Sequence, residues 1–444
     1  MSAIHRCWDD NPLKRPKENE LRILYRNKDL PSLTALYQIL IHTSRILDFK
    51  DLPVRIDFEE QELLVDKLIL NKEIKERYKE SGLCKGCKQP KTTVSWCQSC
   101  SSKRFQEEFK NWTSGNPEID KFIQSIQIKA NKEQIIEWIE YKNFENVEYL
   151  ARGVELLREA ELHVIANECG SVGVIRCYGI TKNPETNEFM MIMERGINGS
   201  LRQYLDKDFS SLSWMNKLDA LRYIVLGIGK IHERGLIHRD FHSGNMINMA
   251  NQIISITDLG LCRPMNAQNN DTYGVLPYVA PEVLRGKEYT QASDIYGFGI
   301  IAYEICTGLP PYHDIAHDRT LAVKICQGLR PKSNYKIPQL ILDIIHRCWD
   351  NDPLKRPKAN ELGILSVYKR EIIDEKNTEI CKQAEEADEI NKDLPSLTAL
   401  LSNTNTLSYT THPQAIYTSR ILDFKGLPES NLINLRIDSE DENN

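Results

Sequence analysis

The sequence predicts an α+β fold in which helices dominate, and three observations lead to that prediction. Residues 60–80 and 103–141 place apolar side chains near a 3.6-residue period, which is typical of amphipathic helices, and Gly82 follows the first stretch as a stop signal. The run Ile253 to Ile256 is short and apolar, as a buried strand is. Four cysteines between the two helical stretches indicate a small separate module.

Length and charge narrow the class of protein. The chain of 444 residues has room for about three domains, and its 41% hydrophobic and 27% charged residues are ordinary for a globular protein. We expect a cytoplasmic protein without membrane association, because no run approaches the roughly 18 apolar residues of a membrane span and the N-terminus lacks a signal-peptide layout. The net charge of −6 offers no general basic field, so no nucleic-acid partner is expected.

Two parts of the sequence are near copies of each other. Residues 4–21 match residues 345–362 at all but three positions, and the strings NKDLPSLTAL and TSRILDFK each occur once near either end of the chain. If the later copy closes a larger domain, the earlier copy is a domain end without its domain, and its apolar face has nothing of its own to pack against. We therefore expect residues 1–59 to be an orphan duplicated segment that packs loosely or borrows a surface.

The cysteine cluster follows the pattern C-x2-C-x9-C-x2-C and consists of Cys84, Cys87, Cys97 and Cys100. Two such pairs can hold a tetrahedral Zn²⁺, and Gly86 and Pro90 suit the tight turn that follows the first pair. Four thiolates leave no open coordination position, so we expect a structural zinc knuckle. Four reduced cysteines clustered by chance are the alternative, and the surrounding lysines are expected to be a solvated face.

The motifs that carry chemistry lie between residues 238 and 299. HRDFHSGN, DLG, APE and SDIYGFG follow one another in that order. Phosphoryl transfer explains these residue types, because the transferring group is highly anionic and needs Mg²⁺ held by hard oxygen ligands. Asn245 and Asp258 can supply those ligands, and Asp240 can orient an attacking hydroxyl and accept its proton.

With these motifs, residues 146–365 resemble the eukaryotic protein kinases. The resemblance implies a bilobal fold with a largely helical C-lobe, ATP and Mg²⁺ as cofactors, and protein hydroxyls as acceptors. It implies that Asp240, within the His238-Arg239-Asp240 motif, is the catalytic base, and that Asn245 and Asp258 are the metal ligands.

Further roles follow from the same resemblance. Met193 corresponds to the gatekeeper, the backbone of Glu194 to Gly196 to the hinge that faces adenine, and Ile247 to the floor of the adenine pocket. Three structural residues are implied as well: Glu282 pairing with Arg356, and Asp294 receiving backbone amides of the catalytic loop.

The type of kinase is indicated less sharply. His242 stands where serine/threonine kinases usually carry lysine, and HRDFHSGN looks closest to the tyrosine-kinase-like serine/threonine group. Val275 departs from that group, so specificity for serine or threonine over tyrosine stays open.

One part of the kinase pattern is missing. Glu159 corresponds to the helix glutamate that pairs with a strand lysine, yet no glycine-rich loop or such lysine lies between the strand-like residues 146–153 and Val154. Roughly forty residues are absent by this comparison, which implies a truncated N-lobe. Either the sequence lacks a segment that the living protein has, or the chain is a pseudokinase whose C-lobe works as a binding platform.

The predicted organisation has four parts. These are the orphan segment 1–59, a helical region 60–145 with the zinc knuckle at 84–100, a kinase domain 146–367, and an acidic tail 368–444 in which residues 401–419 are expected to be disordered. The predicted function is ATP-dependent phosphorylation of protein substrates in intracellular signalling, impaired in this chain. A non-catalytic scaffold that binds signalling partners is the alternative.

Overall fold

The computed structural model describes residues 72–129, 134–144, 156–167, 173–249, 253–264, 272–374, 378–392, 410–424 and 426–427. The chain divides into two compact units, Met1–Lys132 and Glu133–Asn444, which are described separately below. The predicted orphan segment and the strand expected at residues 146–153 lie outside the described residues.

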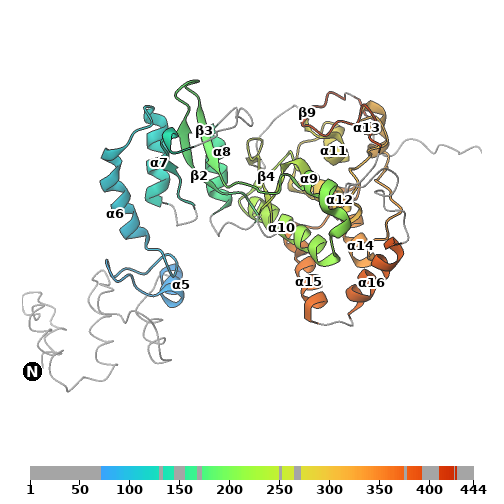
Figure 1. Ribbon diagram of the computed structural model, residues 1–444, viewed down its shortest axis with the longest axis horizontal. Helices are drawn as coiled ribbons and strands as arrows, with labels where there is room; N and C mark the ends of the chain where they lie inside the picture. Colours follow the sequence, from blue (N-terminus) through green and yellow to red (C-terminus); the bar gives the residue numbers. More distant parts are fainter. Residues whose placement is uncertain are drawn as a thin grey trace, which may run out of the picture. The chain divides into compact units, whose positions relative to one another are not determined.

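The described part of the first unit is helical around a cysteine-bearing loop. Its helices are α5 (Lys72–Ser81), α6 (Gln98–Glu108) and α7 (Pro117–Lys129), with a 3-10 turn η3 (Phe109–Asn111) after α6 (Figure 1). Helix α5 ends at Gly82, whose φ of +65° is a conformation that glycine adopts without a steric cost, so the predicted stop signal is confirmed. Helices α6 and α7 pack on each other, and α7 buries Ile119 and Ile123.

The second unit begins with a three-stranded sheet of order β1-β2-β3, made of β1 (Glu137–Trp138), β2 (Cys177–Lys182) and β3 (Phe189–Met193). Strand β1 runs parallel to β2, and β3 runs antiparallel to it. Helix α8 (Leu156–Ala166) packs against β2 and β3. The 3-10 turn η5 (Tyr141–Asn143) follows β1.

The helical prediction for residues 103–141 is wrong at β1. Ile136 is fully buried, Glu137 is exposed and Trp138 is half-buried, so the pattern here has the period of a strand. The neighbouring isoleucines made the stretch apolar enough for a helix, but the residues pair with β2 and are therefore a strand.

Helices build the rest of the second unit. They are α9 (Leu201–Asp208), α10 (Trp214–Glu233), α11 (Pro281–Leu284), α12 (Gln291–Thr307), α13 (Arg319–Cys326), α14 (Gln339–Cys348), α15 (Ile364–Asp374) and α16 (Glu379–Lys392). Helix α12 is buried along nearly its whole length and packs against α10 and α14, so it forms the centre of the core. Capping boxes at Ser213 and Thr290 define where α10 and α12 begin.

Short ladders and turns connect these helices. The strand pairs are β4 (Leu236–Ile237) with β7 (Arg263–Pro264), β5 (Met246–Asn248) with β6 (Ile254–Ile256), and β8 (Tyr273–Gly274) with β9 (Arg420–Ile421). The 3-10 turns are η6 (Phe209–Ser211), η7 (Ser243–Asn245), η9 (Leu276–Tyr278), η10 (Pro353–Lys355) and η11 (Ala359–Gly363). The strand expected at Ile253 to Ile256 is β6.

The later copy of the repeat is the closing part of this core. Residues 345–362 form the end of α14 and the turns η10 and η11, and they bury Cys348, Trp349 and Leu362. This copy therefore has the domain against which its apolar residues pack.

The C-terminal tail differs from its prediction. Residues 410–424 have a described course, and β9 pairs with β8, which lies almost 150 residues earlier in the chain. The expected disorder of residues 401–419 is wrong for residues 410–419, and residues 401–409 lie outside the described residues.

Candidate active site and cysteine cluster

The loop from His238 to Asn245, between β4 and β5, is held by an aspartate of α12. The Asp294 carboxylate accepts hydrogen bonds from the backbone N–H groups of His238, at 2.8 Å, and Arg239, at 3.0 Å. It also contacts Nε2 of His232 at 2.9 Å. Arg239 has a φ of +73°, a left-handed conformation that costs a non-glycine residue about 1–3 kcal/mol and persists where surrounding contacts determine it.

The carboxylate of Asp240 is buried at the centre of this loop. The Asn245 side-chain amide donates to the Asp240 backbone oxygen at 3.0 Å and approaches its Oδ2 at 3.3 Å. Burial by itself would raise the pKa of Asp240, but hydrogen bonds from His242 and Ser419 bring this pKa below its ordinary value. Asp240 is therefore held as a carboxylate that can accept a proton.

Two more carboxylates meet next to this loop. Thr257 donates its backbone N–H to the Asn245 oxygen at 3.0 Å, which positions the following Asp258, whose φ is +56°. Burial and the charge of Asp258 raise the pKa of Glu159 in α8 to about 7. Nε2 of His163 lies 3.9 Å from the Glu159 carboxylate. Burial and the neighbouring Asp258 charge therefore both disfavour the ionised form of Glu159.

The residues predicted to face adenine also come together. Glu194 follows β3 and donates its backbone N–H to the Arg176 oxygen at 2.8 Å. Gly196 lies so close to Ile247 that a Cβ at that position would approach Ile247 Cγ2 to 1.9 Å. Glycine is therefore required where the segment after Met193 passes over β5.

A buried ion pair ties α11 to the end of the core. Arg356 Nη1 and Nη2 donate to the two oxygens of Glu282 at 2.6 and 2.7 Å, and both residues are buried. The same guanidinium donates to the backbone oxygens of Asp350 and Ala292. The geometry is bidentate, which only an arginine fork provides.

Sequence reasoning missed a second buried network below the loop. Glu304 of α12 is fully buried and accepts hydrogen bonds from Arg202, Tyr278 and Ser243 at 2.6, 2.7 and 3.1 Å. A glutamate inside a largely apolar helix, as in AYEIC, is a signal that could have indicated a paired buried charge.

The sequence also did not indicate that Ser419, in the C-terminal tail, contacts the Asp240 carboxylate. Ser419 donates its hydroxyl to Asp240 Oδ2 at 2.6 Å. The signal available was the repeated string TSRILDFK, which contains this serine, but nothing in the sequence links that string to the loop.

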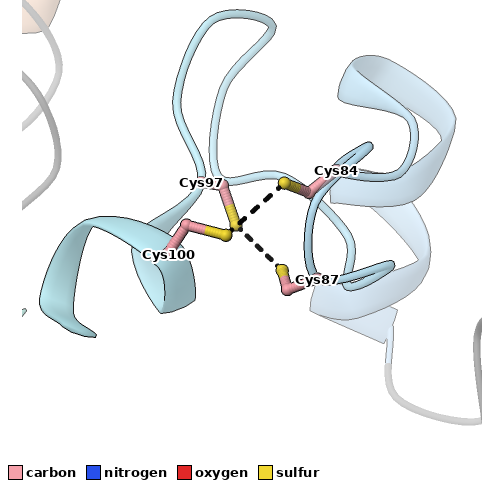
Figure 2. A group of neighbouring side chains, drawn as sticks. All are labelled: Cys84, Cys87, Cys97 and Cys100. Atoms are coloured by element: carbon pink, nitrogen blue, oxygen red, sulfur yellow. Dashed lines mark hydrogen bonds between the residues drawn. The ribbon is translucent and has the colours of Figure 1, made fainter. Parts of the chain in front are cut away.

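The four cysteines of the first unit converge on one point (Figure 2). Their Sγ atoms all lie within 4.8 Å of one another, with Cys84 and Cys100 3.7 Å apart and Cys87 and Cys97 3.3 Å apart. Tetrahedral zinc with bonds of about 2.3 Å requires sulfur atoms about 3.8 Å apart, so the spacing fits the metal.

The electrostatics of the cluster also suit a cation. A hydrogen bond from the Cys87 backbone lowers the pKa of Cys84 to about 6, whereas burial raises the pKa of Cys97 to about 12. One thiolate therefore forms readily, and a divalent cation would stabilise the others. Across the part of the chain that the structure describes, no other group of three or more metal-binding side chains is gathered in this way.

The same part of the chain contains no helix with the length and apolar character needed to cross a membrane.

Comparison with known proteins identifies the second unit. The family model described as protein tyrosine and serine/threonine kinase matches residues 142–364. A probable serine/threonine-protein kinase of Dictyostelium discoideum is 31% identical over 196 residues, covering 43% of this chain and 14% of that protein. The dual serine/threonine and tyrosine protein kinase of Mus musculus is 33% identical over 181 residues, covering 40% and 19%. A tyrosine protein kinase of Caenorhabditis elegans is 30% identical over 219 residues, covering 46% and 40%.

The chain thus spans less than half the length of each of these relatives. The matched segment, however, makes up half of this chain and contains every kinase site residue predicted from the sequence, from Glu159 to Arg356. On this evidence the chain belongs to the protein tyrosine and serine/threonine kinase family.

Proposed function

We propose that this chain is a serine/threonine protein kinase of the tyrosine-kinase-like group, which transfers the γ-phosphate of ATP to hydroxyls of protein substrates in cytoplasmic signalling. The observation that carries the proposal is a set of linked polar residues. The Asn245 amide is bonded to the buried Asp240, and the backbone of Asn245 accepts a hydrogen bond from Thr257, the residue before Asp258. A probable serine/threonine-protein kinase and a dual serine/threonine and tyrosine protein kinase among the relatives support serine and threonine as acceptors, with tyrosine as a further acceptor.

Asp240 is the proposed catalytic base. A substrate hydroxyl attacks the γ-phosphorus, the bond to the leaving ADP oxygen breaks, and the hydroxyl proton passes to the Asp240 carboxylate. The depressed pKa of Asp240 keeps that carboxylate ionised before the step. Arg239 and His238 position it through the Asp294 hydrogen bonds to their backbone.

Mg²⁺ is the proposed metal, and the site fits it. The Asn245 amide nitrogen donates to Asp240, so its oxygen is the end available for a cation, and Asp258, which follows the residue bonded to the Asn245 backbone, would offer a carboxylate. Burial, together with the charge of Asp258, raises the pKa of Glu159, and a cation bound here would favour the ionised carboxyl group. When bound, the metal would screen the charge of the ATP phosphates.

For ATP, we propose the surface where the segment from Glu194 to Gly196 meets Ile247. Backbone groups of the segment after Glu194 would contact the edge of a purine, and Met193 and Ile247 would offer apolar contact. The close approach of Gly196 to Ile247 supports this assignment.

We further propose that the fold is bilobal, with β2, β3 and α8 as a truncated N-lobe, and that the domain spans residues 146–367. Because the sequence lacks a glycine-rich loop and a strand lysine to pair with Glu159, transfer by this chain is expected to be slow and ATP affinity weak. Zn²⁺ in the cysteine cluster is the proposed structural metal of residues 84–100.

The test is phosphoryl transfer from radiolabelled ATP, with Mg²⁺, to dephosphorylated casein. Asp240→Asn should abolish the transfer, whereas Asp343→Asn, an exposed carboxylate that accepts a bond from Gln339, should leave it unchanged. Equal label with Asp240→Asn would refute the proposed base. Rapid transfer by the wild-type chain would refute the impairment alone.

The absent phosphate-binding segment favours a second candidate, a pseudokinase scaffold that binds protein partners. Thermal unfolding with and without Mg-ATP separates the two candidates. A higher melting temperature with Mg-ATP supports the kinase, and an unchanged melting temperature together with no transfer to casein supports the scaffold.

A further inference from the structure

The tail segment made of residues 410–424 and 426–427, called the C-terminal strap below, lies along the candidate active site. Its main chain is held at several points: His412 N–H donates to the His313 oxygen at 2.8 Å, His317 N–H donates to the Gln414 oxygen at 3.0 Å, and Leu422 N–H donates to the Thr272 oxygen at 2.8 Å. These are backbone contacts to an extended segment, the way in which an added strand is recognised.

Side chains of the strap also contact the rest of the unit. The Tyr417 hydroxyl donates to the Pro311 oxygen at 3.0 Å, and the Arg420 guanidinium donates to the His317 oxygen at 2.7 Å. Leu422 and Leu427 are buried in the same core cluster as α12. The strap is therefore seated by apolar burial as well as by hydrogen bonds.

The pairing of β9 with β8 fixes which strap residue reaches the loop. Tyr273 lies opposite Ile421 and Gly274 opposite Arg420, so the next residue, Ser419, is brought to the buried Asp240. The Ser419 hydroxyl donates to Asp240 Oδ2 at 2.6 Å, and the Tyr273 hydroxyl donates to the Ser419 backbone oxygen at 3.4 Å.

His242 completes the arrangement around this hydroxyl. Its Nδ1 accepts the backbone N–H of Gly244 at 3.1 Å, so in the neutral ring Nε2 carries the proton. That Nε2 lies 3.0 Å from the Ser419 oxygen and donates to it. One lone pair of the oxygen accepts from His242, its proton points at Asp240, and the other lone pair remains for attack.

From this geometry we propose that Ser419 is a phosphorylation site of the chain itself, with the C-terminal strap bound as the acceptor peptide. The inference rests on the proposed kinase function. The Ser419 oxygen forms a bond to the γ-phosphorus of ATP, the bond from that phosphorus to the ADP oxygen breaks, and the serine proton passes to Asp240. The products are phosphoserine and ADP.

The proposal also states the kind of peptide that the groove accepts. The acceptor is a serine in an extended segment, followed by two residues that pair with β8 and then by a buried leucine. Because the acceptor belongs to the same chain, its effective concentration is high, and modification should occur even where transfer to a separate substrate is slow.

The experiment uses the full chain, incubated with Mg-ATP in the presence of dephosphorylated casein, with phosphorylation sites mapped by mass spectrometry. We expect phosphate on Ser419 and a rate constant that is unchanged when the protein concentration is raised tenfold. Ser419→Ala should remove the label from the tail peptide, whereas Thr418→Ala, an exposed hydroxyl next to it, should keep it. Circular dichroism checks that both variants are folded.

Label on casein without label on Ser419 overturns this inference and leaves the proposed function standing. Label on neither acceptor overturns the proposed function, and the inference with it. A rate that rises in proportion to the protein concentration overturns transfer within one chain. Hydrogen exchange checks the docking without ATP: the Leu422 amide should exchange slowly, and rapid exchange throughout residues 412–422 would overturn the bound strap.

Discussion

Arg356→Met tests how the end of the kinase core is held. The substitution removes two hydrogen bonds to Glu282, at 2.6 and 2.7 Å, and two to the backbone oxygens of Asp350 and Ala292, at 2.8 and 2.9 Å. It also leaves the Glu282 carboxylate buried without its cation. Breaking such a pair by removing one partner costs about 3–5 kcal/mol, a large share of the roughly 5–15 kcal/mol by which a domain is stable.

Urea unfolding followed by circular dichroism measures this loss. With a slope of about 2 kcal/mol per molar urea, the midpoint should fall by about 2 M. The sequence provides a matched control, because Arg15 occupies the same position in the earlier copy of the repeat, within the same string PLKRP. The segment that carries Glu282 is not repeated, so Arg15→Met should change the free energy of unfolding by less than about 0.5 kcal/mol.

Two results would refute this reasoning. One is a loss below about 1 kcal/mol for Arg356→Met, and the other is an equal loss for Arg15→Met. A double variant gives a further check: Glu282→Met should recover part of the stability in the Arg356→Met background, because an apolar pair carries no unpaired buried charge.

Three further predictions concern other parts of the molecule. The purified chain should contain one zinc, lost on Cys87→Ser and retained on Cys381→Ser as measured by atomic absorption, and zinc in both variants would contradict the assigned ligands. Burial lowers the pKa of His163 to about 4, so the neutral ring is favoured in the folded protein. The free energy of unfolding should therefore fall by about 2–3 kcal/mol as pH drops from about 6.5 to about 4. A His163→Gln variant with the same pH profile would show that His163 does not cause this loss. Gly196→Ala should lower the affinity for Mg-ATP at least tenfold, measured from the shift in melting temperature, because the added Cβ would lie 1.9 Å from the Ile247 side chain. Adding Ile247→Ala should restore part of the affinity, and no recovery in the double variant would contradict this cause.

Structural features that depend on a few neighbouring residues could be predicted from the sequence, because their physical cause is local. The cysteine spacing predicted the convergence of four Sγ atoms, since two C-x2-C turns bring each pair together without help from the rest of the fold. The stop of α5 at Gly82 has the same local character, because it depends on the φ of one residue. In contrast, the stretch around Ile136 has apolar residues that suit a helix or a strand, and only pairing with β2 distinguishes them.

The tail was misread for a related reason. Residues 410–419 have the polar, hydroxyl-rich composition of a disordered segment, and composition says nothing of the hydrogen-bonding groups that another part of the chain offers to it. The backbone of β8 and His313 supplies those groups. The order of the motifs predicted phosphoryl-transfer chemistry, but no motif predicted that Ser419 lies beside Asp240.

The sequence by itself determined the family chemistry, the four-cysteine module and the duplication, since each is written in residue types at set spacings. Only the tertiary structure decided that Glu159 faces Asp258, that Glu304 is buried with three donors, and that Ser419 lies against Asp240. The physical reason is sequence separation: the hydrogen bonds among these contacts join residues that lie from 26 to 179 positions apart. Such contacts form when the core brings separate elements together, and no local pattern encodes which partner each side chain will meet.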